Sequence, residues 1–249
     1  QLYPAPLVAL FACIAFVTFH VCTFPEAFSA WSGDTMWTVI LMMIFATGIA
    51  KTGLIDRIAF NTLKFFPATY TGMVVAIMAT STILSPIVPN SYSKCAVLGP
   101  FAASVAKANN IEKGSKAAAG LFCAFFVPAA IHTMAFLTGS AMTFVLIGMM
   151  GEGYSFSWFG WFICCSVWFA VNLVLTFLFI LVYYRPKEKL NISKDLINRK
   201  IAELKPMNSD EKAASVILIL SILLWITGSY TGLKPYTVAA LAFCAMFLK

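Results

Sequence analysis

The segment Ser85–Lys94, with the sequence SPIVPNSYSK, carries the side chains best suited to bind a small charged ligand. Its serines, asparagine and tyrosine offer hydroxyl and amide groups, and Lys94 offers a positive charge. Its two prolines cannot donate backbone hydrogen bonds, so they end a helix rather than continue it. Long apolar stretches flank the segment on both sides. A polar, proline-broken segment between such stretches is typical of an ion or substrate site.

The ends of two helices would meet at this segment. The helix before it ends with unpaired carbonyl groups and the negative end of its dipole, and the helix after it begins with free N–H groups and the positive end. One place can therefore bind a cation and an anion, as broken helices do in many secondary transporters. The alternative is a proline kink in which serines such as Ser81, Ser85, Ser93 and Ser104 bond to their own helix.

A second polar interruption lies in HTMAFLTGSAMT, from His132 to Thr143. The surrounding stretch 117–150 would be about 51 Å long as one straight helix, whereas the hydrocarbon core is about 30 Å thick. A break near Gly139, which tolerates unusual backbone angles, would resolve the excess. The alternative is a glycine that only lets two helices pack closely.

The two interruptions together define a candidate site. The predicted sodium ligands are Ser85, Asn90, Ser91, Gly139 and Thr143. The predicted substrate-binding residues are Asn90, Ser91, Tyr92, Ser93, Lys94, Ser140 and Thr143. A lysine at membrane depth costs about 2.5–3.5 kcal/mol. Three roles for Lys94 stay open: it pairs with a bound dianion, it takes the place of a coupling cation, or it extends into a water-filled vestibule.

Composition indicates the class of protein that must position these residues. Of the 249 residues, 61% are hydrophobic and only 11% are charged, against about 25% charged in soluble domains. We therefore expect an all-α polytopic membrane protein. The seven cysteines lie in apolar runs without metal-ligand spacing, which favours neither disulfides nor zinc. No cofactor is expected besides sodium as a coupling ion. Because both ends of the chain look cut, we expect a fragment of a longer protein.

Hydrophobic stretches and charge runs divide the chain. We expect Asn208 and Glu211 to form a capping box before the last complete helix. The expected segments are spans over 6–24 and 35–50, an interfacial helix over 51–66, a re-entrant hairpin over 68–106, a broken helix over 117–150, a span over 158–184, a charged cytoplasmic linker over 185–212, and helices over 213–230 and 237–248.

The basic residues orient these segments. Fourteen of the 17 lysines and arginines lie in 51–67, 107–116 and 185–212, whereas 25–34 and 151–157 contain none. Since cytoplasmic loops concentrate Lys and Arg, the three basic segments are predicted to be cytoplasmic. This topology explains the net charge of +7 without nucleic acid. It also leaves both flanks of 68–106 on one side. A second arm over 93–106, about 21 Å long, favours a re-entrant hairpin over two full spans.

In the two polar interruptions, around Asn90 and around Gly139, the chain resembles the N-terminal half of the divalent anion:sodium symporter family. In VPNSYSKCAVLGPF, the spacing to Pro100 puts Asn90, Ser91 and Tyr92 at the family's Ser-Asn-Thr motif. Tyr92 departs from that motif. Gly139–Thr143 resembles the family's Gly-Thr-Pro-Pro-Asn break, with Thr143 in place of Asn, and the stretch KTGLIDRIA is also similar.

The resemblance implies a secondary active transporter of di- or tricarboxylates or sulfate, either sodium-coupled or exchanging anions. It implies elevator-type alternating access, a homodimer in the plasma membrane, and two inverted repeats. Residues 1–184 would form the first repeat, and 213–249 would begin the second. The alternatives are another permease of the same superfamily, such as an arsenite or sodium/proton antiporter, a non-transport membrane protein, or a hydrolase that uses Ser91 and Lys94 as a Ser-Lys dyad.

We predict that Lys64→Cys and Lys107→Cys, each in a cysteine-free background, react with an impermeant maleimide only from the cytoplasmic side, because both positions lie in basic segments. Labelling intact and inside-out vesicles measures this. Rapid labelling of Tyr92→Cys from outside by a bulky reagent would instead indicate two full spans.

Overall fold

The computed structural model describes residues 3–67, 69–88, 91–150, 156–186, 195–204 and 206–248. All regular secondary structure within these ranges is helical, which confirms the predicted all-α class. The α-helices are, in chain order, α1 (Ala5–Thr18), α2 (Phe24–Ala27), α3 (Asp34–Thr52), α4 (Leu54–Lys64), α5 (Tyr70–Leu84), α6 (Ser91–Ala108), α7 (Lys116–Ala130), α8 (Ala141–Met149), α9 (Trp158–Tyr183), α10 (Asp195–Glu203), α11 (Ser209–Ile226), α12 (Gly228–Thr231) and α13 (Pro235–Phe247). Three short 3₁₀ helices are η1 (Ser29–Ser32), η2 (His132–Ala135) and η3 (Leu137–Gly139).

Two helical segments of the described chain are long and apolar enough to cross a membrane. They are Lys116–Ala135, of 20 residues, and α9, of 26 residues. Helices α3 and α4 meet the same test only as a pair, and they are bent by 68° at Gly53. The surface of α9 is almost entirely apolar and exposed, including Val167 at 74% and Val182 at 72%. Such a surface is stable against lipid rather than water, as expected for an integral membrane protein.

The bend at Gly53 sets the direction of α4. Gly53 has φ +86°, a left-handed conformation that glycine adopts without steric cost, and it ends α3. The interfacial helix expected over 51–66 therefore begins only at Leu54, because Lys51 and Thr52 still belong to α3. Helix α4 is amphipathic and buries Leu54, Ile55, Ala59 and Leu63.

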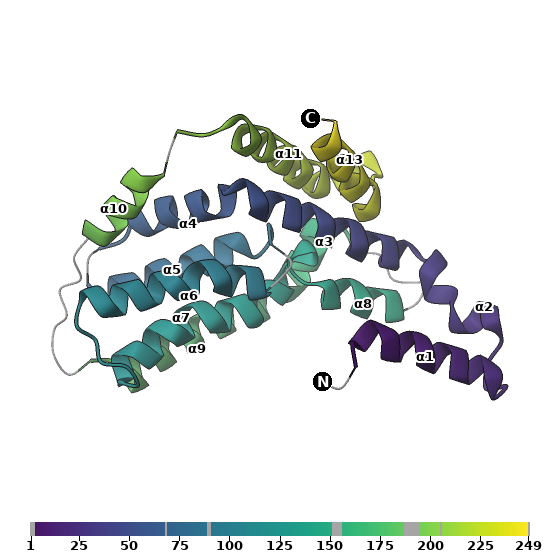
Figure 1. Ribbon diagram of the computed structural model, residues 1–249, viewed down its shortest axis with the longest axis horizontal. Coiled ribbons are helices and arrows are strands. Elements are labelled where there is room, and N and C mark those ends of the chain that lie inside the picture. The colour runs from purple at the N-terminus through teal and green to yellow at the C-terminus, as the bar shows by residue number, and fades with distance from the viewer. Residues whose placement is uncertain are drawn as a thin grey trace.

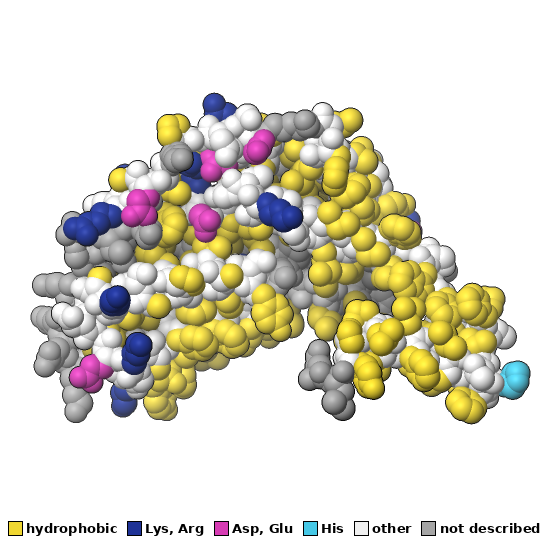
Figure 2. All heavy atoms as spheres, in the orientation of Figure 1, with side chains coloured by type: hydrophobic (Ala, Val, Ile, Leu, Met, Phe, Trp, Pro, Cys, Tyr) yellow, Lys and Arg dark blue, Asp and Glu magenta, His cyan; other side chains and the backbone are white. Residues whose placement is uncertain are grey.

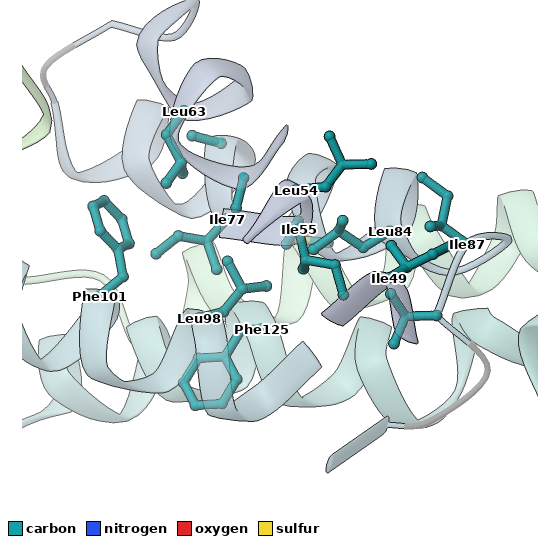
Figure 3. Close-up of a cluster of buried hydrophobic side chains, with 14 of the residues drawn as sticks. Ile49, Leu54, Ile55, Leu63, Ile77, Leu84, Ile87, Leu98, Phe101 and Phe125 are labelled. Atoms are coloured by element: carbon teal, nitrogen blue, oxygen red, sulfur yellow. The ribbon is translucent and has the colours of Figure 1, made fainter. Parts of the chain in front are cut away.

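The helices form two groups that meet along α4 (Figure 1). Helices α5, α6, α7 and α9 lie side by side and form the lower group. Helices α3 and α4 extend above them, and α11 and α13 pack on the row formed by α3 and α4. The close-up in Figure 3 shows Leu63 of α4 facing Ile77 of α5, with Leu98 of α6 and Phe125 of α7 beneath. One continuous apolar core therefore joins both groups.

A tyrosine joins three helices of the lower group. The hydroxyl of Tyr70, at the start of α5, lies 3.0 Å from the carbonyl oxygen of Ala117 on α7 and 3.1 Å from that of Tyr184 after α9. Gly120 makes room for this hydroxyl, since a Cβ at Gly120 would collide with it. The start of the predicted hairpin is thereby fixed to α7 and α9.

The two arms of the predicted hairpin are α5 and α6. Helix α5 has 15 residues, about 22 Å, and α6 has 18 residues, about 27 Å. The second arm is thus longer than the expected 93–106, because the helix already includes Ser91 and continues to Ala108. Both arms pack mainly on α7, and each remains shorter than a hydrocarbon core of about 30 Å.

The predicted break near Gly139 in the apolar stretch 117–150 begins well before that glycine. Helix α7 continues through Pro128 and ends at Ala130, and the Ile131 N–H still bonds to the Val127 carbonyl oxygen. The chain then forms η2 and η3, and α8 begins at Ala141. The break therefore extends from Ile131 to Ser140.

The first turn of α11 carries a partly buried ion pair. Asn208 and Glu211 form the predicted capping box, with the Glu211 N–H 2.7 Å from Asn208 Oδ1. The Glu211 carboxylate also lies 2.9 Å from an Arg57 guanidinium nitrogen on α4, and the two side chains are 10% and 18% exposed. Figure 2 shows charged side chains over α4, α10 and the α6–α7 connection, whereas α1 and α2 are largely hydrophobic.

We expect Glu211→Gln to destabilise the full-length protein in detergent by about 3 kcal/mol, because the substitution removes the negative charge of a largely buried ion pair. Differential scanning fluorimetry measures the change in melting temperature. The matched control is Asp34→Asn in the exposed pair with Lys234, where the two side chains are 62% and 65% exposed, and it should cost less than about 1 kcal/mol. Equal effects of the two variants would contradict a structural role for the α4–α11 pair.

Candidate functional site

The end of α5 rests against the break between α7 and α8. The hydroxyl of Thr138 donates a hydrogen bond of 2.8 Å to the carbonyl oxygen of Pro86, and the indole N–H of Trp158 donates one of 3.0 Å to that hydroxyl. Gly139 lies against the same turn, because a Cβ there would be 3.1 Å from the Ser85 carbonyl oxygen and 3.0 Å from Thr133 Oγ1. Two polar interruptions that are far apart in the sequence thus form one site.

Lys94 extends its ammonium group into this junction. Its side chain comes from the first turn of α6 and is fully buried. The ammonium nitrogen lies 2.8 Å from Thr133 Oγ1 and 3.3 Å from Ser85 Oγ. The end of α5, the start of α6 and the break after α7 therefore converge on one positive charge.

The two hydroxyl groups present lone pairs to the ammonium. Ser85 Oγ donates its own proton to the carbonyl oxygen of Ser81 at 2.9 Å. Thr133 Oγ1 donates its proton to the carbonyl oxygen of Gly139. Since each hydroxyl proton is directed to a carbonyl, each oxygen is left to accept from Lys94. The arrangement suits a cation.

The serines divide between their own helix and α7. Ser85 and Ser104 bond to carbonyl groups four residues back on the chain, as in the proline-kink alternative. Ser81 and Ser91 instead donate across to α7, to the carbonyl oxygens of Phe125 at 3.2 Å and Ala129 at 2.6 Å. The second pair attaches both arms to α7.

The remaining predicted residues of the first interruption lie in different surroundings. Ser93 is half-buried on α6. The ring of Tyr92 is 86% exposed and therefore lies on the outer surface of this chain. Asn90, predicted both as a sodium ligand and as a substrate contact, lies outside the described residues together with Pro89. Among the predicted residues, Lys94 bonds to Ser85, and Gly139 lies against the Ser85 carbonyl, so these three lie together.

The second interruption places two predicted residues at the start of α8. Ser140 is its N-cap, and its hydroxyl accepts the Met142 N–H at 3.2 Å. Thr143 is 3% exposed, and within the described structure its hydroxyl has no hydrogen-bond partner. A buried hydroxyl without a partner in the first turn of a helix is suited to donate to an anion.

Three contributors were absent from the predicted set: Thr133, Thr138 and Trp158. Thr133 and Thr138 belong to the quoted stretch HTMAFLTGSAMT, so their hydroxyl groups were visible as polar residues in an apolar run. Trp158 opens α9, and no sequence signal connects it to Thr138. These partners depend on how α7 and α9 pack.

The contacts of the described side chains bear on the metal-site and hydrolase alternatives. Within the described ranges, there is no group of three or more His, Cys, Asp or Glu side chains that could hold a metal ion. The proposed Ser-Lys dyad is not assembled, because Ser91 donates to Ala129 while Lys94 contacts Ser85 and Thr133. These contacts give no support to the hydrolase alternative.

Comparison with known proteins gives related matches along the whole chain. A family model described as "Sodium:sulfate symporter transmembrane region" matches residues 1–249. Dicarboxylate transporter 1 of Spinacia oleracea chloroplasts is 29% identical over 98% of this chain and 45% of its own length. A putative malate transporter of Bacillus subtilis is 24% identical over 98% of this chain and 53% of its own length. The chain thus spans about half the length of these relatives.

We expect Gly139→Ala to destabilise the protein by about 1–3 kcal/mol, the usual cost of overpacking, because the new methyl group would press on Thr133 and on the Ser85 carbonyl. The melting temperature of the purified full-length protein measures this. Gly99→Ala on α6 is the control, since its Cβ would make an ordinary contact of 3.5 Å with Phe125. A Gly139→Ala protein as stable as Gly99→Ala would contradict the close approach of α5 to the break.

Proposed function

Because the chain belongs to the sodium:sulfate symporter family, we propose that the protein is a secondary transporter of divalent anions and that dicarboxylates are its substrate class. The observation that carries this proposal is the convergence of two helix ends and a helix break on the buried ammonium of Lys94. The names of the Spinacia and Bacillus relatives support carboxylates over sulfate.

An anion bound at this junction would find donors of three kinds. The free N–H groups at the start of α6 and α8 favour negative charge. The hydroxyl groups of Thr143 and Ser140 lie in or next to the first turn of α8. The Lys94 side chain supplies an N–H donor from the first turn of α6. One carboxylate of the substrate would bind here, and the other would bind residues of the longer protein.

The proposed transport requires a site that can face either side of the membrane. We propose that α5 and α6 form a re-entrant hairpin that opens to the cytoplasm. The short arms, their packing on α7 and the basic flanking segments support this. Residues 1–184 would form the first of two inverted repeats, 185–212 a cytoplasmic linker, and 213–249 the start of the second repeat. The site would alternate by an elevator-type movement within a homodimer in the plasma membrane.

We expect the full-length protein in proteoliposomes to take up radiolabelled malate. Unlabelled malate and succinate should compete with that uptake, while sulfate and the monocarboxylate lactate at the same concentration should compete at least tenfold less well. This order follows if the two charges of the substrate bind two separated sets of donors. Protein-free liposomes are the control. Stronger competition by sulfate than by succinate would overturn the assignment to dicarboxylates.

A further inference from the structure

A groove of about 760 Å³ lies between α6 and α7, next to the connection that joins them. Its volume is within the usual range of ligand sites, about 300–1,000 Å³. Its walls are small or apolar residues, and the exposed Ala103 and Phe122 show that it is open to the surroundings. From Gly99 to Lys107 the α6 wall is about 12 Å long, most of the depth of one leaflet, about 15 Å. The polar lining residues gather at the connection and are Lys107, Asn110 and Lys113.

The backbone of the α6–α7 connection fixes the mouth of this groove. Asn110 has the left-handed φ of +52°, and the Ile111 N–H bonds back to the Ala106 carbonyl oxygen at 2.9 Å. This pattern is a Schellman motif, which closes the end of a helix. The hydroxyl of Ser115 then caps the start of α7. Because both ends of the connection are held by hydrogen bonds, its basic residues stay next to the groove.

The mouth of the groove is positively charged. Lys107 and Lys113 are exposed, and within the part of the chain that the structure describes neither has a carboxylate partner. The connection also contains Glu112 and Lys116, which do not line the groove and whose charges cancel. Figure 2 shows charged side chains at this end of the lower group beside a hydrophobic surface. A groove that is apolar along its length and basic at one end is complementary to an acyl chain with an anionic head.

We propose that this groove binds an anionic phospholipid of the cytoplasmic leaflet, with its phosphate at Lys107 and Lys113 and one acyl chain between α6 and α7. The orientation is the one proposed above for the hairpin, and the identity of the transported anion does not enter. A lysine next to an anionic lipid surface strengthens binding about fivefold. A zwitterionic lipid brings its own positive charge to the two lysines, and a free phosphate leaves the apolar walls uncovered. The bound lipid joins the second arm of the hairpin to α7.

The test measures lipid binding to the delipidated full-length protein in detergent by native mass spectrometry. The protein is titrated with phosphatidylglycerol or with phosphatidylcholine of identical acyl chains. We expect phosphatidylglycerol to bind at least tenfold more tightly, and glycerol phosphate, which has the anionic group without the chains, to displace none of it. Equal affinity for the two lipids, or displacement by glycerol phosphate at the lipid concentration, would overturn the inference. Neither result depends on whether the protein transports dicarboxylates.

Variants separate the head of the lipid from its chain. Replacing both Lys107 and Lys113 by Gln should lower the affinity for phosphatidylglycerol at least tenfold, whereas Lys116→Gln, which removes a lysine of the same connection outside the groove, should leave it unchanged. Ala103→Phe should weaken binding of both lipids, because the ring would fill the groove. It should leave the melting temperature of the lipid-free protein unchanged, because Ala103 is exposed. Wild-type affinity in the double variant and in Ala103→Phe would overturn the inference.

Cross-linking locates the bound lipid. Phosphatidylglycerol with a diazirine in one acyl chain is bound to the full-length protein and activated by light, and the modified peptides are identified by mass spectrometry. We expect modification of α6 and α7 within residues 99–125, and its loss in Ala103→Phe. Modification confined to other helices, as when another part of the longer protein covers the groove, would contradict the proposal.

Discussion

The backbone groups at the ends of broken helices need partners inside the protein, because hydrocarbon offers none. This requirement accounts for the way α5, α6 and α7 are joined. Thr138 donates to the Pro86 carbonyl beyond α5, and Ser91 donates to the Ala129 carbonyl near the end of α7. These two hydrogen bonds join α5 and α6 to α7 and to the break that follows it.

The charge of Lys94 is a second consequence of the same junction. Its own helix begins there, so its dipole opposes a positive charge, but the end of α5 favours one. The hydroxyl oxygens of Ser85 and Thr133 can accept hydrogen bonds from the ammonium, because their own hydroxyl protons are donated to the carbonyl oxygens of Ser81 and Gly139. The lysine thus depends on carbonyl groups that exist only because two helices are interrupted.

The sequence predicts the elements around the candidate site better than the contacts between them. The helical class, the two polar interruptions and the capping box at Asn208 follow from composition, proline positions and residue spacing. Thr133 was not predicted, because its contact with Lys94 joins residues 39 positions apart and depends on how α6 packs against α7. The break begins at Ile131, eight residues before the glycine at 139 that signals it in the sequence.

The contact between α4 and α5 has a mechanical consequence. Apolar side chains such as Leu63 and Ile77 face one another there (Figure 3). Burial of apolar surface has no preferred direction and depends mainly on area. Because buried side chains interdigitate, shifting α5 along α4 would require many of them to repack together, and α5 and α6 are in addition joined to α7 by hydrogen bonds from Ser81 and Ser91. A movement of α5 relative to α4 would therefore proceed between discrete packed arrangements rather than by continuous sliding.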